Sequence, residues 1–355
     1  MPSFAKRTYF DSTLPLIPVE HSHHTCKLCG GGCRSYDVLL TEREARRLDL
    51  DLWRPLLNEV PEDAPLVLLD SATGQYTLNK VGGRCVFLDS DNLCIVHKSA
   101  GLRAKPLACQ FFPFQTVQTP EGTHLSLNVG CRRLIEMTPA DAPLDMQEAG
   151  MLLGEVTALA TIPDALPLTP DEDILFDDLK VLVADLLAIL SEDTVAVRLT
   201  RAAKFLLQIP VSAPPAAHPL ALFADLHRLV TNAPALRPSL ISLYSKAATP
   251  LAVLLHAEET VTYPAEAEPY FTEVARQHLA GYQFALHRTA RTGLVALLAA
   301  FVYAVFAAQV STGSGMRADH ALNEAVSDGV DLFLSPAGQV ALTEPNQQAF
   351  LQVLC

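Results

Sequence analysis

The fold of this chain is decided by the stretch Thr25-Cys26-Lys27-Leu28-Cys29-Gly30-Gly31-Gly32-Cys33-Arg34, which puts three thiols within eight residues. Three successive glycines allow the backbone positive φ angles, so the loop can wrap those thiols around one point. A metal ion or an iron–sulfur cluster needs that geometry, whereas a hydrophobic core does not. The loop therefore predicts a metal centre that later cysteines complete by folding back onto it.

The later cysteines continue to residue 131 at spacings that suit metal ligation. After Cys33 come 51 residues, the pattern C-x8-C-x2-H, 11 residues to Cys109 and 21 residues to Cys131. Thiolates are soft ligands that select zinc, copper(I) or iron–sulfur clusters. Eight donors would fill two four-coordinate zinc sites, or would hold one four-iron (4Fe-4S) cluster with groups left over. The candidate metal ligands are Cys26, Cys29, Cys33, Cys85, Cys94, His97, Cys109 and Cys131.

The start of the chain contains no apolar run that would act as a secretion signal, so we expect a cytoplasmic protein. Disulfides are rare in that compartment, where clustered cysteines are more often metal ligands or redox groups. Metal ligation is therefore the favoured interpretation over disulfides or inert thiols. The eighth cysteine, Cys355, stands alone at the end of the chain.

Charge divides the chain unevenly. Residues 1–140 carry 15 Lys and Arg against 15 Asp and Glu, whereas residues 141–355 carry 11 against 24, which accounts for the net charge of −13. A nucleic-acid-binding protein needs a basic face; the acidic half argues against one, and the neutral half does not support one. We expect an α+β protein with two domains: a small, irregular cysteine-cluster metal-binding domain at 1–140 with short hairpins, and an acidic, mostly α-helical domain at 141–355.

Local patterns in the first domain predict its elements. Residues 1–25 are expected to form an irregular arm. The stretch Thr41-Glu42-Arg43-Glu44 fits a reciprocal N-terminal cap and opens a helix, which Pro55 ends or bends. Residues 66–80 predict a hairpin that turns at Thr73-Gly74.

Two further strand patterns carry candidate ligands. Residues 85–97 predict a second hairpin, which would place Cys85 and Cys94 on facing strands. Residues 123–129 alternate polar and apolar side chains and predict a strand that delivers Cys131 at its end.

The second domain has the texture of packed helices. Thr169-Pro170-Asp171-Glu172 fits a helix start, and an apolar stripe at helical spacing follows over 174–190. Gly293–Ala308 is uncharged and apolar, but its 16 residues fall short of the ~20 that span a bilayer, so we expect a buried helix and no membrane span. Further helices are expected near 144–160, 194–208, 219–231, 238–256, 269–290, 293–310 and 344–354.

Two kinds of side chain accompany the cysteines. Converging thiolates accumulate negative charge, which nearby cations stabilise, and we expect Arg34 and Lys105 in that role. Phe111, Phe112 and Phe114 can pack around Cys109 and exclude water, or can form an ordinary aromatic core segment. Three histidines precede the cysteine loop and are expected to form an exposed polar lead-in in preference to ligands: His21, His23 and His24.

The cysteine loop, the C-x8-C-x2-H pattern and the motif K-P-x2-C-x2-F-P-F together resemble the YkgJ-type cysteine-cluster family, described as a zinc- or iron-chelating domain. The resemblance covers residues 24–133, and the chain looks most like the longer branch that includes flagellin lysine-N-methylase. The family's loop usually reads C-x2-C-x2-C-C. Here Gly32 stands where the first cysteine of the final pair would be, and Cys33 matches the second.

Three functions follow as expectations. The first is a cytoplasmic metal-binding protein that holds zinc or an iron–sulfur cluster. The second, which the resemblance implies, is an S-adenosylmethionine-dependent protein lysine N-methylase with a protein substrate such as flagellin. The sequence contains no Gly-rich loop after a strand and no alternation of strands and helices that a Rossmann-like methyltransferase would show. The third is a structural metal centre in a protein-interaction module.

Overall fold

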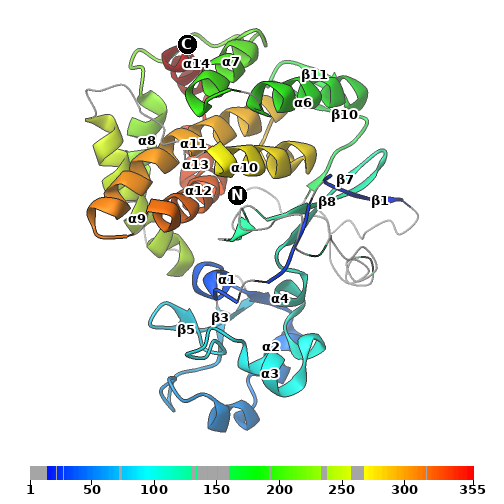
Figure 1. Ribbon diagram of the computed structural model, residues 1–355, viewed down its shortest axis with the longest axis vertical. Helices are drawn as coiled ribbons and strands as arrows, with labels where there is room; N and C mark the ends of the chain where they lie inside the picture. The colour runs from blue at the N-terminus through cyan, green and yellow to red at the C-terminus, as the bar shows by residue number, and fades with distance from the viewer. Residues whose placement is uncertain are drawn as a thin grey trace.

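The structure is a computed structural model that describes residues 14–20, 22–26, 28–71, 74–128, 131, 133–134, 142, 150, 160–191, 193–232, 238–256, 268–316 and 318–355. Figure 1 shows a small lobe, residues 28–112, below a larger lobe made mostly of helices. Strands β7 and β8 lie where the two lobes meet. A sheet-containing N-terminal region therefore precedes a helical region, which confirms the predicted α+β class.

The small lobe consists of short elements around a hydrophobic core of its own. The core includes Leu48, Leu66 and Phe87, and burial of such side chains is the main force that holds a lobe of this size together. Its elements are α1 (Gly31–Ser35), β2 (Leu39–Leu40), α2 (Glu42–Leu48), η1 (Asp51–Leu56), β3 (Val67–Asp70), β4 (Gln75–Leu78), β5 (Lys80–Val81), β6 (Arg84–Cys85), α3 (Ile95–Ala100), η2 (Leu102–Ala104) and α4 (Leu107–Phe111).

Local signals predicted part of this lobe correctly. The Thr41 hydroxyl accepts a hydrogen bond from the Glu44 amide, and the Glu44 carboxylate accepts from the Thr41 amide, which confirms the cap. Strands β3 and β4 form the hairpin expected at 66–80, although Thr73 of its turn lies outside the described residues. The expectation that Pro55 ends or bends this helix is wrong, because α2 already ends at Leu48, and Pro55 lies in the following 3-10 helix η1.

A four-stranded sheet joins the N-terminal segment to the larger lobe. Its order is β1 (Leu16–Pro18), β8 (Gly122–Leu127), β7 (Phe114–Thr119) and β9 (Ala160–Thr161). The strand predicted near 123–129 is confirmed as β8, which pairs antiparallel with β7. The expected irregular arm is wrong at β1, which pairs in parallel with β8. Three residues are too few for a periodic signal, so this pairing depends on a partner that lies a hundred residues away.

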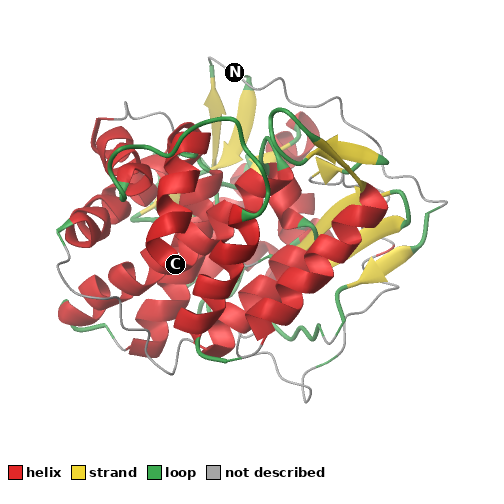
Figure 2. Ribbon diagram, turned by 90° about the horizontal axis from the view of Figure 1, so that it is seen from above, coloured by secondary structure: helices red, strands yellow, loops and turns green. Residues whose placement is uncertain are grey.

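The larger lobe packs its helices around one hydrophobic core. Seen from above, the helices gather on one side and most strands lie on the other (Figure 2). The elements are β10 (Ala165–Pro167), β11 (Asp173–Leu175), α6 (Phe176–Ser191), α7 (Val195–Leu207), α8 (Ala221–Asn232), α9 (Pro238–Leu255), α10 (Glu268–Ala280), η5 (Gln283–Leu286), α11 (Ala290–Gly313), α12 (Ala318–Leu334), α13 (Pro336–Ala341) and α14 (Glu344–Leu354).

Most predicted helices of this lobe are present, with three differences. The start expected at Thr169 is wrong, because 169–172 form the turn between β10 and β11, and α6 begins at Phe176. The helix expected over 269–290 ends at Ala280, where the chain turns into η5. Helices α12 and α13 were not predicted. Most of the helix expected at 144–160 lies outside the described residues, and Ala160 at its end belongs to strand β9.

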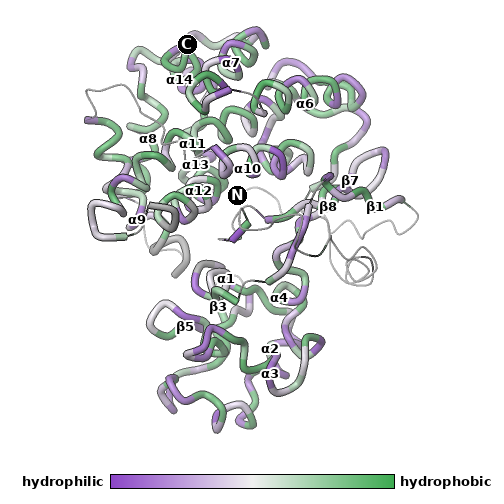
Figure 3. The backbone as a smooth tube through the Cα atoms, in the orientation of Figure 1, coloured by the Kyte–Doolittle hydropathy of each residue, from purple (hydrophilic) through white to green (hydrophobic). Residues whose placement is uncertain are grey.

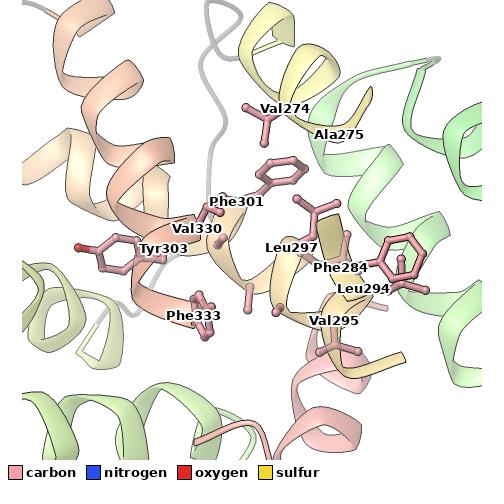
Figure 4. Close-up of a cluster of buried hydrophobic side chains, with 14 of the residues drawn as sticks. Val274, Ala275, Phe284, Leu294, Val295, Leu297, Phe301, Tyr303, Val330 and Phe333 are labelled. Atoms are coloured by element: carbon pink, nitrogen blue, oxygen red, sulfur yellow. The ribbon is translucent and has the colours of Figure 1, made fainter. Parts of the chain in front are cut away.

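Helix α11 is the centre of the larger core. It is apolar over most of its length (Figure 3) and contacts side chains of α10, η5 and α12 (Figure 4). With 24 residues it is long and apolar enough to cross a membrane, but 89% of its most apolar window is buried, which confirms the buried-helix expectation. Gly293 is required here, because a Cβ at that position would lie 2.2 Å from the Phe284 carbonyl oxygen.

The core extends beyond the second predicted domain. Side chains of β7 and β8, including Val117 and Leu125, belong to the same hydrophobic cluster as the helices. The Leu127 amide donates to Gln277 Oε1 at 2.7 Å, and Gln283 Nε2 donates to the Leu127 carbonyl oxygen at 3.1 Å. The division of the chain at residue 140 stays a prediction.

Candidate metal centre

The backbone conformation of Gly30 and hydrogen bonds around Cys29 determine the shape of the cysteine loop. Gly30 has a φ of 64° and precedes α1, which begins at Gly31 and carries Cys33. The Gly31 amide donates to the Cys29 sulfur at 3.3 Å, and Arg34 donates to the Cys29 carbonyl oxygen at 2.9 Å. A Cβ at position 30 would lie 2.6 Å from the Arg34 guanidinium, so both φ and space favour glycine there.

The loop from residue 85 to residue 94 places two more thiols. Cys85 ends β6, and Cys94 precedes α3 and pairs with Leu88 as an isolated bridge. The Asp89 carboxylate accepts hydrogen bonds from the Asp91 amide at 2.9 Å and the Leu93 amide at 2.8 Å, which closes a tight turn. This turn brings Cys94 back towards Cys85.

The expected hairpin over 85–97 is therefore wrong. Residues 95–100 form helix α3 instead of a facing strand, because the Ile95 amide donates to the Phe87 carbonyl oxygen and the chain then winds into the helix. His97 consequently lies on an exposed helical turn. The predicted approach of Cys85 and Cys94 is nevertheless retained, since the two thiols interact electrostatically.

Cys109 is carried by α4, which lies between two prolines. Pro106 precedes the helix, and the Leu107 amide at its start donates to Glu44 Oε1 at 2.7 Å. Burial acts to raise the pKa of Glu44, but hydrogen bonds from Leu107 and Thr41 lower it overall. One carboxylate thus caps α2 and ties it to the helix that carries Cys109, a link that the capping motif alone did not predict.

Four thiols from four elements share one neighbourhood in the small lobe. Electrostatic interactions connect all six pairs among Cys33, Cys85, Cys94 and Cys109, and Cys29 joins them through Cys33. Among the described residues, no three His, Cys, Asp or Glu side chains already lie in a ligating arrangement. The four thiols therefore lie near one another, but their sulfur atoms do not yet converge on one metal position.

Burial sets the protonation of these thiols. It raises the pKa of Cys33 and Cys109, and it raises the pKa of Cys85 to about 12, because a thiolate is poorly solvated there. Neighbouring thiols raise these values further. Lys105 lowers the pKa of Cys33 and Cys109, and Arg34 lowers that of Cys33. This is the supporting role expected of the two cations, and a soft thiolate set next to cations fits zinc or iron.

Three further predicted ligands lie in other surroundings. Cys26 is exposed at the edge of the loop, and His97 is exposed on α3. Cys131 is buried, but it belongs to the hydrophobic core of the larger lobe. The ligand role of these three residues stays a prediction.

The aromatic segment after Cys109 spans both lobes. Phe111 and Phe114 pack with the larger core, and their ring centroids are 5.7 Å apart. Phe112 contacts Tyr36, with centroids 5.6 Å apart, and covers α1 next to Cys33. A Cβ on Gly32 would lie 3.2 Å from the Phe112 ring, so a cysteine at position 32 would require a small shift of this ring.

The histidines before the loop differ from an exposed lead-in. His23 and His24 are half-buried, and the His24 ring meets Phe114 edge-on at 5.8 Å. The His24 amide donates to the Ala142 carbonyl oxygen at 3.0 Å. His24 thus packs against the aromatic segment, while His21 lies outside the described residues.

Comparison with known proteins gives one match. Residues 25–132 match the CxxCxxCC family, whose description reads "Putative zinc- or iron-chelating domain". The match includes all eight predicted ligands, so residues 25–132 are similar to this family, which confirms the predicted resemblance to a cysteine-cluster family. No curated protein and no solved structure matches the chain. The narrower resemblance to flagellin lysine-N-methylase stays a prediction.

Proposed function

We propose that the protein binds one zinc ion or one iron–sulfur cluster through the thiolates of Cys33, Cys85, Cys94 and Cys109. The observation that carries this proposal is that these four thiols, from four elements, all interact with one another. Four thiolates are the donor set of many structural zinc sites and of four-iron clusters. Cys29, which interacts with Cys33, is a fifth thiol close to these four and could serve as an alternative ligand.

The chain's own residues have distinct parts in this proposal. Arg34 and Lys105 offset the negative charge of the bound thiolates, while Gly30, Asp89 and Glu44 fix the three segments that carry them. A bound zinc ion would cross-link these segments, and a bound cluster would add electron transfer. Three of the thiols have a raised pKa and are protonated at neutral pH, so metal binding must release their protons.

The proposal includes a cytoplasmic location. It rests on the clustering of seven cysteines between residues 26 and 131, which in a reducing compartment is more typical of metal ligation than of disulfides. The lysine methylase with flagellin as its substrate and S-adenosylmethionine as its cofactor, and the protein-interaction module, stay predictions. The described strands form a mixed four-stranded sheet and smaller antiparallel sheets, and they provide no observation that favours the methylase.

The experiment is purification without air, followed by an absorption spectrum and analysis for zinc, iron and acid-labile sulfide. We expect one zinc per chain with no visible absorption, or about four iron and four sulfide per chain with a broad band near 400 nm, as ~4 thiolates would hold. These two results distinguish the two centres. Less than a tenth of one metal equivalent, in protein that is folded by circular dichroism, would overturn the proposal.

A further inference from the structure

A small cavity in the larger lobe is lined by two histidines and otherwise by apolar side chains. His278 comes from α10, and His287 follows η5. Leu297, Val330 and Phe333, which line the same cavity, appear in Figure 4 among the core side chains of α11 and α12. The remaining lining residues are Ala296, Ala300 and Leu334. No Asp, Glu, Lys or Arg side chain is among these lining residues, and both histidines are neutral at pH 7, so a charged ligand would lack a counter-charge there.

His278 lacks hydrogen bonds that a buried imidazole needs. Its side chain is 2% exposed, and both ring nitrogens are without a partner among the described residues. Buried polar atoms in proteins are almost always hydrogen-bonded, to protein or to internal water. His278 and His287 also interact electrostatically, which places the two imidazoles near each other.

Gln339 determines which nitrogen of His287 carries the proton. Gln339 Nε2 lies 3.2 Å from the Phe333 carbonyl oxygen and 2.8 Å from His287 Nδ1. A carbonyl oxygen only accepts, so this Gln339 atom is the donating NH2 group, and His287 Nδ1 must accept from it. A neutral His287 therefore carries its proton on Nε2.

This tautomer excludes His287 as an ordinary metal ligand. A metal on Nε2 would require the proton on Nδ1, which would then face the Gln339 NH2 group, donor against donor. Rotating the Gln339 amide would turn its oxygen towards the Phe333 carbonyl oxygen, which is equally unfavourable. The His287 Nε2–H group instead needs a neutral hydrogen-bond acceptor. A neutral His278 has one accepting and one donating ring nitrogen, so a molecule between the two rings could hydrogen-bond to both histidines.

We propose that His278 and His287 form an internal binding site for one small neutral hydroxylic molecule, with water as its occupant. The cavity has room for about one water-sized sphere. The water accepts from His287 Nε2–H and donates to a ring nitrogen of His278. It thereby satisfies polar atoms at the point where α10, α11 and α12 meet.

The first test is histidine NMR on the full-length protein at pH 7.5, with ¹⁵N-labelled imidazoles and His287→Gln used to assign the signals. We expect His287 to show an unprotonated Nδ1 and a protonated Nε2. In Gln339→Glu the carboxylate accepts from Nδ1–H, so the tautomer should reverse. A wild-type His287 with its proton on Nδ1, or an unchanged tautomer in Gln339→Glu, would overturn the proposal.

The second test is a high-resolution crystal structure of the wild-type protein, with and without a nickel chloride soak. We expect one water within hydrogen-bonding distance of His287 Nε2 and a His278 ring nitrogen, and no anomalous peak in the cavity after the soak. In His278→Leu the water should be lost. A dry cavity, nickel bound between the histidines, or a water retained in His278→Leu would each overturn the proposal.

Discussion

Cys85→Ser is expected to lose the metal and to unfold the small lobe selectively. Metal binding contributes on the order of 12 kcal/mol to structural zinc sites, so removal of one of four thiolates should cost about 3 kcal/mol, or about 100-fold in affinity. Cys85 is the most informative position, because its thiol is buried and interacts with each of the other three. Metal retained against a competing chelator is the direct measurement.

Matched variants make this prediction specific. Cys355→Ser and Cys26→Ser remove exposed thiols outside the gathered four and should keep the metal. Hydrogen exchange on Cys85→Ser should show lost protection in the core around Leu48 and Phe87, with much less change in α11. An equal loss of protection in both hydrophobic cores would show that the two lobes unfold as one cooperative unit. Wild-type metal affinity in Cys85→Ser, or equal metal loss in Cys26→Ser, would contradict the assigned ligands.

Acid is expected to destabilise the larger lobe through its buried histidines. Burial, with a smaller contribution from His287, lowers the pKa of His278 to about 3, and burial lowers the pKa of His287 to about 4. In the unfolded chain each imidazole has a pKa near ~6.5. Their stabilising contribution is therefore complete above about pH 6.5 and is lost as pH falls towards the folded values. At pH 5 each buried imidazole should lower the free energy of unfolding by about 2 kcal/mol relative to its value at neutral pH.

The measurement is urea unfolding of wild type and His278→Leu at pH 7 and pH 5, at equal metal content. Wild type should lose about 2 kcal/mol more than His278→Leu over this interval, because the variant has one titrating imidazole fewer. His256→Gln, which changes an exposed histidine, should behave as wild type. Equal losses in wild type and His278→Leu would show that His278 does not control acid stability.

The sequence predicted those parts of the fold that local chemistry determines. The Thr41–Glu44 cap needs only four neighbouring residues, and helices such as α7 and α14 have apolar stripes that need no distant partner. Strand β1 could not be predicted, because it exists by pairing with β8. Ile95 and Val96 favour strands by composition, but they follow the turn that Asp89 holds and begin helix α3.

The sequence predicted that the cysteines form a metal centre, but it could not predict which of them bind the metal. Spacing along the chain identified eight donors, whereas the choice among them depends on tertiary packing. Cys131 follows β8, whose side chains pack into the larger core, and it goes there with them. The His278–His287 pair gave no sequence signal, because eight residues lie between the two histidines and α10 ends among them. Only the turn after Ala280 brings both to one cavity.

The most direct test of the account is X-ray absorption at the metal edge of protein purified without air. A centre held by Cys33, Cys85, Cys94 and Cys109 predicts a first shell of about four sulfur atoms near ~2.3 Å, with an iron–iron shell added if a cluster is bound. A first shell made mainly of nitrogen or oxygen would contradict a four-thiolate centre, and so would a metal that Cys85→Ser binds with an unchanged spectrum.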